Sequence, residues 1–177
     1  MLEQPIQSEV LTMEQSSELV NQQGTSLSWM AGFVDGEGTL TFTCDWKRGV
    51  YSPYFQVCNT SFIAFDKCKE ILDYHNIRYH VRTQKLNKNW KIVWKISCSN
   101  YKQVLNIIKL LFPYLIVKKR QAELIQKFSY QRIKNPQEEY TTEQLSIIRL
   151  VKELNQRGPS ETLHLPFPKK DKDKVQT

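Results

Sequence analysis

The stretch WMAGFVDGEG, residues 29–38, decides the fold of this chain. Six apolar or small residues precede two acids, Asp35 and Glu37, which alternate with glycines. Residues 26–36 are predicted to form a short helix, and almost no polar side chain interrupts the run, so this helix should be buried all round. Gly32 and Gly36 are four residues apart on one face, where a second backbone can approach closely, although each glycine costs a helix about 1 kcal/mol.

The two acids stand at the C-terminal end of this predicted helix, where the helix dipole disfavours negative charge. A compensating cation or basic group is therefore expected beside them, and a metal ion would serve. Asp35 is predicted to be structural, accepting hydrogen bonds from nearby backbone donors at the helix end. A plainer interpretation, a buried helix followed by a turn before a hairpin, leaves the glycine spacing upstream unexplained.

Period-two alternation predicts two hairpins after this helix. The first pairs 39–44 with 54–59, and the second pairs 78–84 with 90–98. In the second hairpin one face is aromatic and aliphatic, with Trp90, Ile92 and Trp94, and should rest on a core, while the other is cationic and amide-bearing. Helices are predicted from Thr60 or Ser61 to about residue 75, from 101 to 112, from 117 to 133, and from 141 to about 154.

The charge is unevenly distributed. The chain carries a net +7, yet residues 1–24 hold four glutamates and no Lys or Arg, whereas residues 47–120 hold fifteen Lys or Arg against three acids. A basic region of this kind is typical of a polyanion binder, and the alternative is a solvated basic surface. Three regions are predicted: a polar leader over 1–24, either a short helix or disordered, one domain over 25–158, and a Pro/Lys-rich tail over 159–177.

Cysteine spacing and hydropathy bear on the compartment. The four cysteines form no C-x-x-C pair and have no accompanying His spacing, so neither a zinc site nor a disulfide scaffold is indicated, and reduced thiols are favoured. No apolar run approaches the ~20 residues that span a bilayer, and the acidic start is unlike a secretory signal. The protein is expected inside the cell, in the cytoplasm or an organelle such as a chloroplast or mitochondrion, with no membrane partner.

Residues 30–38 resemble the LAGLIDADG signature of homing endonucleases, with Phe-Val in place of Leu-Ile and Glu37 as the last acid. The predicted order helix, two strands, helix, two strands, helix over 26–133 resembles the αββαββα domain of that family. The resemblance implies an α+β fold with a saddle-shaped antiparallel sheet, to which this chain adds a C-terminal helix.

The resemblance also implies an activity. Family members cut both strands of a long, near-palindromic DNA target by hydrolysing phosphodiester bonds with divalent metal, and many are encoded in mobile introns. A chain with one signature implies a homodimer, in which two copies of Glu37 converge on the minor groove. Mg²⁺, for which Mn²⁺ or Ca²⁺ can substitute in binding, would be held by Glu37 and Gly36. The implied dimer interface comprises Trp29, Ala31, Gly32, Asp35 and Gly36.

Two further catalytic residues follow from position in the family pattern. Asn59, at the end of the second strand, matches a water-positioning residue, although Asn is also a common turn former. Lys118 matches a lysine that serves the phosphate or the water network, with Lys119 or a solvated helix start as alternatives. Some relatives carry a basic residue shortly after the Asn59 position, where this chain has residues 61–64, Ser-Phe-Ile-Ala.

The polar strand faces and the hairpin turns are the predicted DNA contacts. Arg to guanine and Gln to adenine are pairings worth ~1–3 kcal/mol each in the major groove. His80 is either a base contact or an exposed histidine without a role. The predicted set is Thr39, Thr41, Thr43, Lys47, Arg48, Gln56, His80, Arg82, Gln84, Lys88, Lys91 and Lys95.

The alternative functions are an intron RNA maturase and a DNA-binding regulator that does not cut.

Overall fold

The computed structural model describes residues 26–85, 87–136 and 139–156. A helix over 26–37, here called the signature helix, leads directly into the first strand. The remaining elements are β1 (Gly38–Asp45), β2 (Val50–Asn59), α2 (Phe62–Tyr74), β3 (His80–Gln84), β4 (Val93–Cys98), α3 (Tyr101–Leu111), α4 (Lys119–Lys134) and α5 (Thr142–Leu154). The predicted order of helices and strands is confirmed, while the predicted leader and tail lie outside the described residues.

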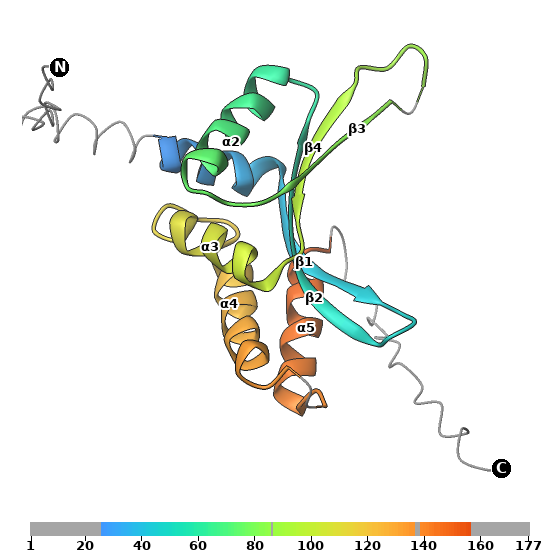
Figure 1. The fold of residues 1–177 in the computed structure, drawn as a ribbon, viewed down its shortest axis with the longest axis vertical. Helices are drawn as coiled ribbons and strands as arrows, with labels where there is room; N and C mark the ends of the chain where they lie inside the picture. Colours follow the sequence, from blue (N-terminus) through green and yellow to red (C-terminus); the bar gives the residue numbers. More distant parts are fainter. Residues whose placement is uncertain (1–25, 86, 137–138, 157–177) are drawn as a thin grey trace, which may run out of the picture.

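The four strands form one antiparallel sheet in the order β1-β2-β4-β3. The two hairpins meet where β2 pairs with β4, and Phe55 lies opposite Cys98 there. The helices gather on one face of the sheet, and the hairpins diverge beyond them as two separate arms (Figure 1). This α+β arrangement leaves the opposite face of the sheet open between the arms.

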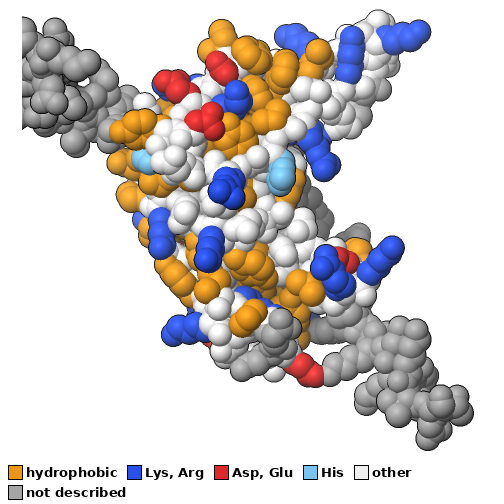
Figure 2. Space-filling model, viewed as in Figure 1, with side chains coloured by type: hydrophobic (Ala, Val, Ile, Leu, Met, Phe, Trp, Pro, Cys, Tyr) orange, Lys and Arg blue, Asp and Glu red, His pale blue; other side chains and the backbone are white. Residues whose placement is uncertain are grey.

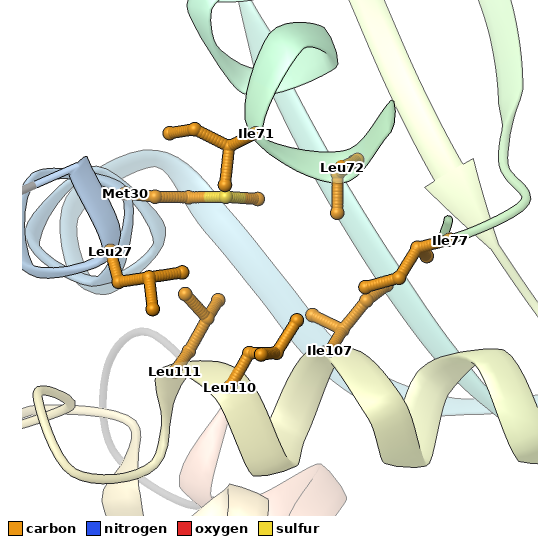
Figure 3. A pocket seen from close by; sticks show the side chains of 8 residues that line it. All are labelled: Leu27, Met30, Ile71, Leu72, Ile77, Ile107, Leu110 and Leu111. Carbon is orange, nitrogen blue, oxygen red and sulfur yellow. The ribbon is translucent and has the colours of Figure 1, made fainter. Parts of the chain in front are cut away.

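Alternation along the strands explains the core. Leu40, Phe55 and Ile96 point to the helical side and are almost completely buried, against Phe128 of α4 and Ile148 of α5 in the same core cluster. The signature helix joins this core through an apolar junction with α2 and α3 (Figure 3). The side chains that line this junction are Leu27, Met30, Ile71, Leu72, Ile77, Ile107, Leu110 and Leu111.

The prediction for the second hairpin is wrong in one respect. Trp90 and Ile92 are 59% and 44% exposed rather than packed on a core, and β4 begins at Val93. All five residues of β3 are exposed as well. The reason is geometric, because this arm runs past the helical layer (Figure 1), so alternation of side chains is present without a surface to cover them.

Helix ends follow the predicted capping chemistry with one exception. The Ser61 hydroxyl accepts a hydrogen bond from the backbone N–H of Ala64, and Thr141 with Gln144 forms a capping box. Helix α4 instead begins at Lys119, two residues later than predicted. The side chain of its N-cap residue, Lys118, makes no capping hydrogen bond to the first turn. Within the described ranges, no helix is both long and apolar enough to cross a bilayer.

Candidate functional site

The junction between the signature helix and β1 holds the exposed carboxylate of Glu37. Gly38 follows at once as the first residue of β1. A Cβ atom at Gly38 would lie 2.6 Å from the backbone oxygen of Val34 and 2.8 Å from its Cα, so only glycine fits there. This tight passage from helix to strand fixes Glu37 at the end of the sheet.

Asp35 connects the signature helix to the start of α4. One carboxylate oxygen accepts hydrogen bonds from the N–H groups of Ile116 and Val117, at 2.8 and 3.1 Å, and the other accepts from the N–H of Lys118 at 2.9 Å. Two of these donors belong to the loop just before α4, and the third, the N–H of the N-cap residue Lys118, is one that a helix start leaves free. The predicted structural role agrees with this geometry, but the donors lie more than eighty residues along the chain rather than at the helix's own end.

Lys118 also lies at this junction. Its side-chain Nζ donates to the backbone carbonyl oxygen of Asp35, at the C-terminal end of the signature helix, where the helix dipole favours a cation. The structure therefore brings two predicted catalytic residues, Glu37 and Lys118, to the same end of one helix. The compensating positive group that the sequence requires beside the acids includes this ammonium.

Asn59 is the last residue of β2, two positions beyond Val57, which pairs with Gly38. It therefore ends at the same edge of the sheet as Glu37. Its side-chain oxygen accepts a hydrogen bond from the N–H of Ser61 at 2.8 Å, as a turn-forming Asn does. The geometry therefore matches a turn former, while the amide nitrogen and the second lone pair of Oδ1 remain for another role.

One chain contributes few metal-binding oxygens here. Within residues 26–85, 87–136 and 139–156, no group of three or more His, Cys, Asp or Glu side chains is placed to hold a metal ion. The Asp35 carboxylate already accepts three hydrogen bonds, which leaves the Glu37 carboxylate and backbone carbonyls such as that of Gly36. An all-oxygen set of this kind suits Mg²⁺ or Ca²⁺, provided that further ligands come from outside the chain.

The sheet face that points away from the helices is polar. Across the strands, Thr39, Gln56, Ser97 and His80 form one row, and Cys58, Lys95 and Arg82 form the next. Side chains on this face bond to one another, because the Tyr54 hydroxyl donates to Gln56 Oε1 at 2.8 Å and Lys95 Nζ donates to Gln84 Oε1. The predicted strand residues therefore share one surface.

Alternation also places Tyr54, Cys58 and Ser97 on this face, although the predicted DNA-contact set leaves them out. Each occupies a position that alternates with a buried neighbour, as Tyr54 does with Phe55. Their side chains are not the usual partners of base edges, so only their place on the strand indicates them.

The hairpin turns carry the predicted cations, and blue side chains mark both arms in Figure 2. Lys47 and Arg48 lie in the β1–β2 turn, where Arg48 Nε is 2.7 Å from Asp45 Oδ2. Lys88 lies in the other turn. Lys91, predicted within a strand, instead precedes β4. Figure 2 shows that the outline of the molecule is hollowed between the two arms.

The signature helix has one uncovered face, so the prediction that it is buried all round is not met within one chain. Trp29 is 40% exposed, and a Cβ atom at Gly32 or Gly36 would meet nothing within 4 Å. Ala31, in contrast, is fully buried in the core, and the Asp35 side chain is engaged by α4. Ala31 and Asp35 therefore have no side chain free for a dimer interface, a correction to the predicted set.

Comparison with known proteins identifies the fold. No protein-family model matches the sequence, and no curated relative matches it. Among solved structures, the homing endonuclease I-CvuI in complex with its target matches with a TM-score of 0.57 and 19% identity, over 81% of this chain and 89% of that one. The group I intron-encoded homing endonuclease I-CeuI complexed with DNA matches with a TM-score of 0.56 and 13% identity, over 80% and 77%.

A longer relative matches over part of its length. The LAGLIDADG meganuclease I-AabMI bound to uncleaved DNA matches with a TM-score of 0.52 and 22% identity, over 76% of this chain and 46% of that one. The chain thus has the fold of the LAGLIDADG homing endonucleases, as the resemblance at residues 30–38 predicts.

Proposed function

We propose that this protein is a site-specific, metal-dependent endonuclease that cuts double-stranded DNA as a homodimer. The observation that carries the proposal is the position of Glu37, an exposed carboxylate held at the junction of the signature helix and β1, with Lys118 at the same helix end. Strand β1 begins one residue later, at Gly38, and Thr39 is its first residue on the polar sheet face. DNA lying against that face would bring a phosphodiester to this carboxylate.

The residues present fit a divalent cation. The Glu37 carboxylate and the Gly36 carbonyl would hold it, and when bound it supplies charge stabilisation at the scissile phosphate and an activated water. The chain's own groups have other tasks. Lys118, fixed by the Asp35 carbonyl, places positive charge near the phosphate, and Asp35 keeps the start of α4 against the helix end.

A second copy would complete the site. One chain offers one free carboxylate at the junction, whereas two cuts require two. The uncovered face of the signature helix has no backbone obstruction at Gly32 or Gly36, so the same face of another copy can approach closely there. Exposed Ile116 and Val117, 83% and 68% accessible, lie beside this helix end and would add apolar area to the contact.

The dimer is tested by Gly32→Leu. Within one chain the new side chain meets open space and replaces a poor helix former, so the fold should persist. Between two copies it would separate the helices. We expect an ultracentrifugation mass of a dimer for the wild type and of a monomer, without cutting, for the variant. A wild-type monomer that cuts DNA contradicts the homodimer.

A DNA-binding protein that does not cut is the second candidate. It is favoured by the segment after Asn59, where Thr60, Ser61, Phe62 and Ile63 are exposed and no cation lies between residues 59 and 66, although some relatives carry a basic residue there. Binding of duplex DNA without metal-dependent cuts would select this candidate.

The decisive experiment compares wild type with Glu37→Gln on a plasmid library of randomised near-palindromic inserts with Mg²⁺. We expect discrete cuts from the wild type and none from Glu37→Gln, with DNA affinity retained within about tenfold. Glu153→Gln, an exposed carboxylate on α5, is the matched control and should cut normally. Full cutting by Glu37→Gln would overturn the catalytic assignment.

A further inference from the structure

We propose that two exposed tryptophans pack against the DNA backbone at the flanks of the bound site. Trp46 directly follows β1 in one hairpin arm, and Trp90 lies shortly before β4 in the other. This inference rests on the proposed binding of duplex DNA to the sheet. It adds a neutral, apolar contact to arms otherwise predicted to hold DNA by charge and hydrogen bonds.

The chain has four tryptophans, and the structure separates them into two kinds. Trp29 stacks on Phe33 with ring centroids 5.4 Å apart, and Trp94 packs against Phe62 and Phe65 at 5.0 and 5.2 Å. Trp46 and Trp90 are 57% and 59% exposed, and within the part of the chain that the structure describes neither stacks on another ring. Both indoles are therefore accessible to a partner outside the chain.

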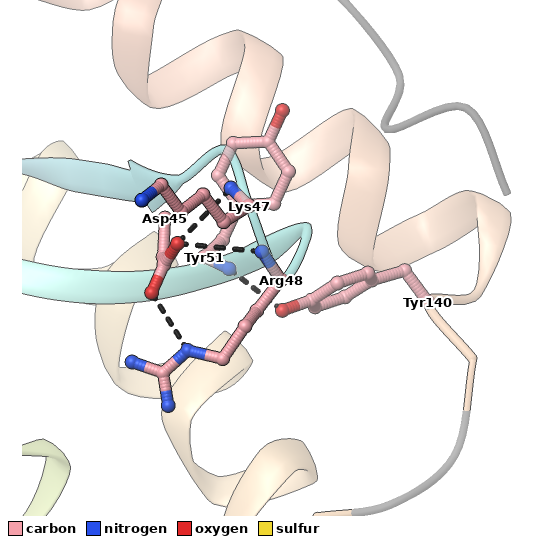
Figure 4. A network of polar contacts seen from close by, with 5 residues as sticks. All are labelled: Asp45, Lys47, Arg48, Tyr51 and Tyr140. Atoms are coloured by element: carbon pink, nitrogen blue, oxygen red, sulfur yellow. Dashed lines mark hydrogen bonds and ion pairs between the residues drawn. The ribbon is translucent and has the colours of Figure 1, made fainter. Parts of the chain in front are cut away.

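The turn that carries Trp46 is held in place before any partner arrives (Figure 4). Asp45 Oδ1 accepts from the backbone N–H groups of Lys47 and Arg48, and Asp45 Oδ2 accepts from Arg48 Nε. Gly49 takes φ 65°, the left-handed conformation that closes the turn. A fixed backbone lowers the entropy cost of placing the indole on a partner.

Trp90 occupies the corresponding place in the other arm. Its backbone N–H donates to the carbonyl oxygen of Asn87 at 3.1 Å, which closes the turn, and Lys88 and Lys91 flank it in sequence. Both arms therefore present the same combination, an exposed indole with two basic residues within two positions of it, Lys47 and Arg48 in one arm and Lys88 and Lys91 in the other.

This combination fits a duplex better than a protein surface. Along the DNA backbone, apolar deoxyribose faces alternate with phosphates, so an indole can cover a sugar while adjacent basic residues reach neighbouring phosphates. The indole N–H adds one donor to a phosphate oxygen. Lysine is depleted at protein–protein interfaces, whereas a lysine directly follows each indole here, Lys47 after Trp46 and Lys91 after Trp90.

The test uses a fluorescein-labelled duplex of random sequence and the full chain. Trp46→Ala and Trp90→Ala should each raise Kd about tenfold. Because the lost contact is neutral, the slope of log Kd against log salt should stay as in the wild type, whereas Lys47→Ala should reduce it by about 0.9. Tyr74→Ala removes a side chain that is 63% exposed on α2, outside the sheet, and should leave Kd unchanged.

Location is tested by hydroxyl-radical footprinting on the target duplex that the plasmid library yields, in which each Trp→Ala variant should lose sugar protection at the outer ends of the footprint only. Unchanged Kd and footprint for both variants, with a wild type that binds, would overturn this inference alone. A wild type that binds no duplex would overturn both this inference and the proposed function. If the wild type binds and only Glu37→Gln loses cutting, the proposed function stands, and the Kd values of the two Trp→Ala variants decide this inference by themselves.

Discussion

The two hairpin arms share one sequence pattern but differ in support. In the β1–β2 arm, Phe42 packs edge-on against Phe128 of α4 with centroids 4.6 Å apart, and the Tyr140 hydroxyl accepts a hydrogen bond from the Tyr51 N–H at 2.8 Å. The Tyr101 hydroxyl donates to the Tyr51 carbonyl from the other side. In the β3–β4 arm every residue of β3 is exposed.

The comparison shows that alternation of side chains along a strand determines which way they point. Whether an arm is rigid depends on the helices that pack against it. An arm with buried contacts should open only with the whole domain, while an arm of exposed backbone hydrogen bonds can open locally. We infer that the β1–β2 arm is fixed before DNA arrives and that the β3–β4 arm adjusts to it.

The largest expected effect is at the base of the supported arm. Phe128→Ala removes a fully buried ring that contacts both Phe42 and Tyr140, and should lower the free energy of unfolding by about 3–5 kcal/mol, measured by urea denaturation. Val81→Ala in β3, where the side chain is 45% exposed, is the control and should change stability by less than about 1 kcal/mol. Similar losses for the two variants would contradict unequal support.

A smaller effect is expected from Tyr140→Phe. The variant keeps the ring over which Arg132 lies, 4.5 Å from the centroid, but removes the oxygen that accepts from the Tyr51 N–H. An unpaired, partly buried N–H should cost about 1–2 kcal/mol. Amide exchange at Tyr51 should accelerate while exchange in β3 stays unchanged, and acceleration in both arms would show that they open together.

The sequence predicts much of this arrangement, because local rules determine it. Strand alternation, the Ser61 and Thr141 caps and the Gly38 turn need only neighbouring residues. The exposure of Trp90 does not follow from such rules, since it depends on how far the helices reach along the sheet.

The candidate site divides in the same way. Glu37 could be singled out from its own stretch, but the bonds from Asp35 to residues 116–118 depend on tertiary packing across more than eighty residues. The helical phase that buries Ala31 and exposes Gly32 likewise depends on which face meets the core.

A third prediction uses pH in the supported arm. Burial raises the pKa of Tyr101 from 10.0 to about 12. Between these values the unfolded chain loses the phenolic proton while the folded chain keeps it, so stability is intact below pH 10 and falls as pH rises toward 12. After allowance for solvent screening, the loss should be about 1 kcal/mol. Tyr101→Phe should flatten this part of the stability profile, and parallel profiles would contradict the assignment.

The smallest effect is expected in the exposed arm. Gln84→Ala removes the acceptor for Lys95 Nζ, a cross-strand bond on the polar face of β3 and β4. Because water can accept the hydrogen bond from the exposed Lys95 Nζ in place of the lost amide oxygen, the free energy of unfolding should change by less than about 0.5 kcal/mol, measured by the same urea denaturation. Native-state exchange should still show β3 amides opening before those of β2. If Gln84→Ala instead costs as much as Tyr140→Phe, the exposed arm is held by its surface contacts, and the two arms are equally fixed before binding.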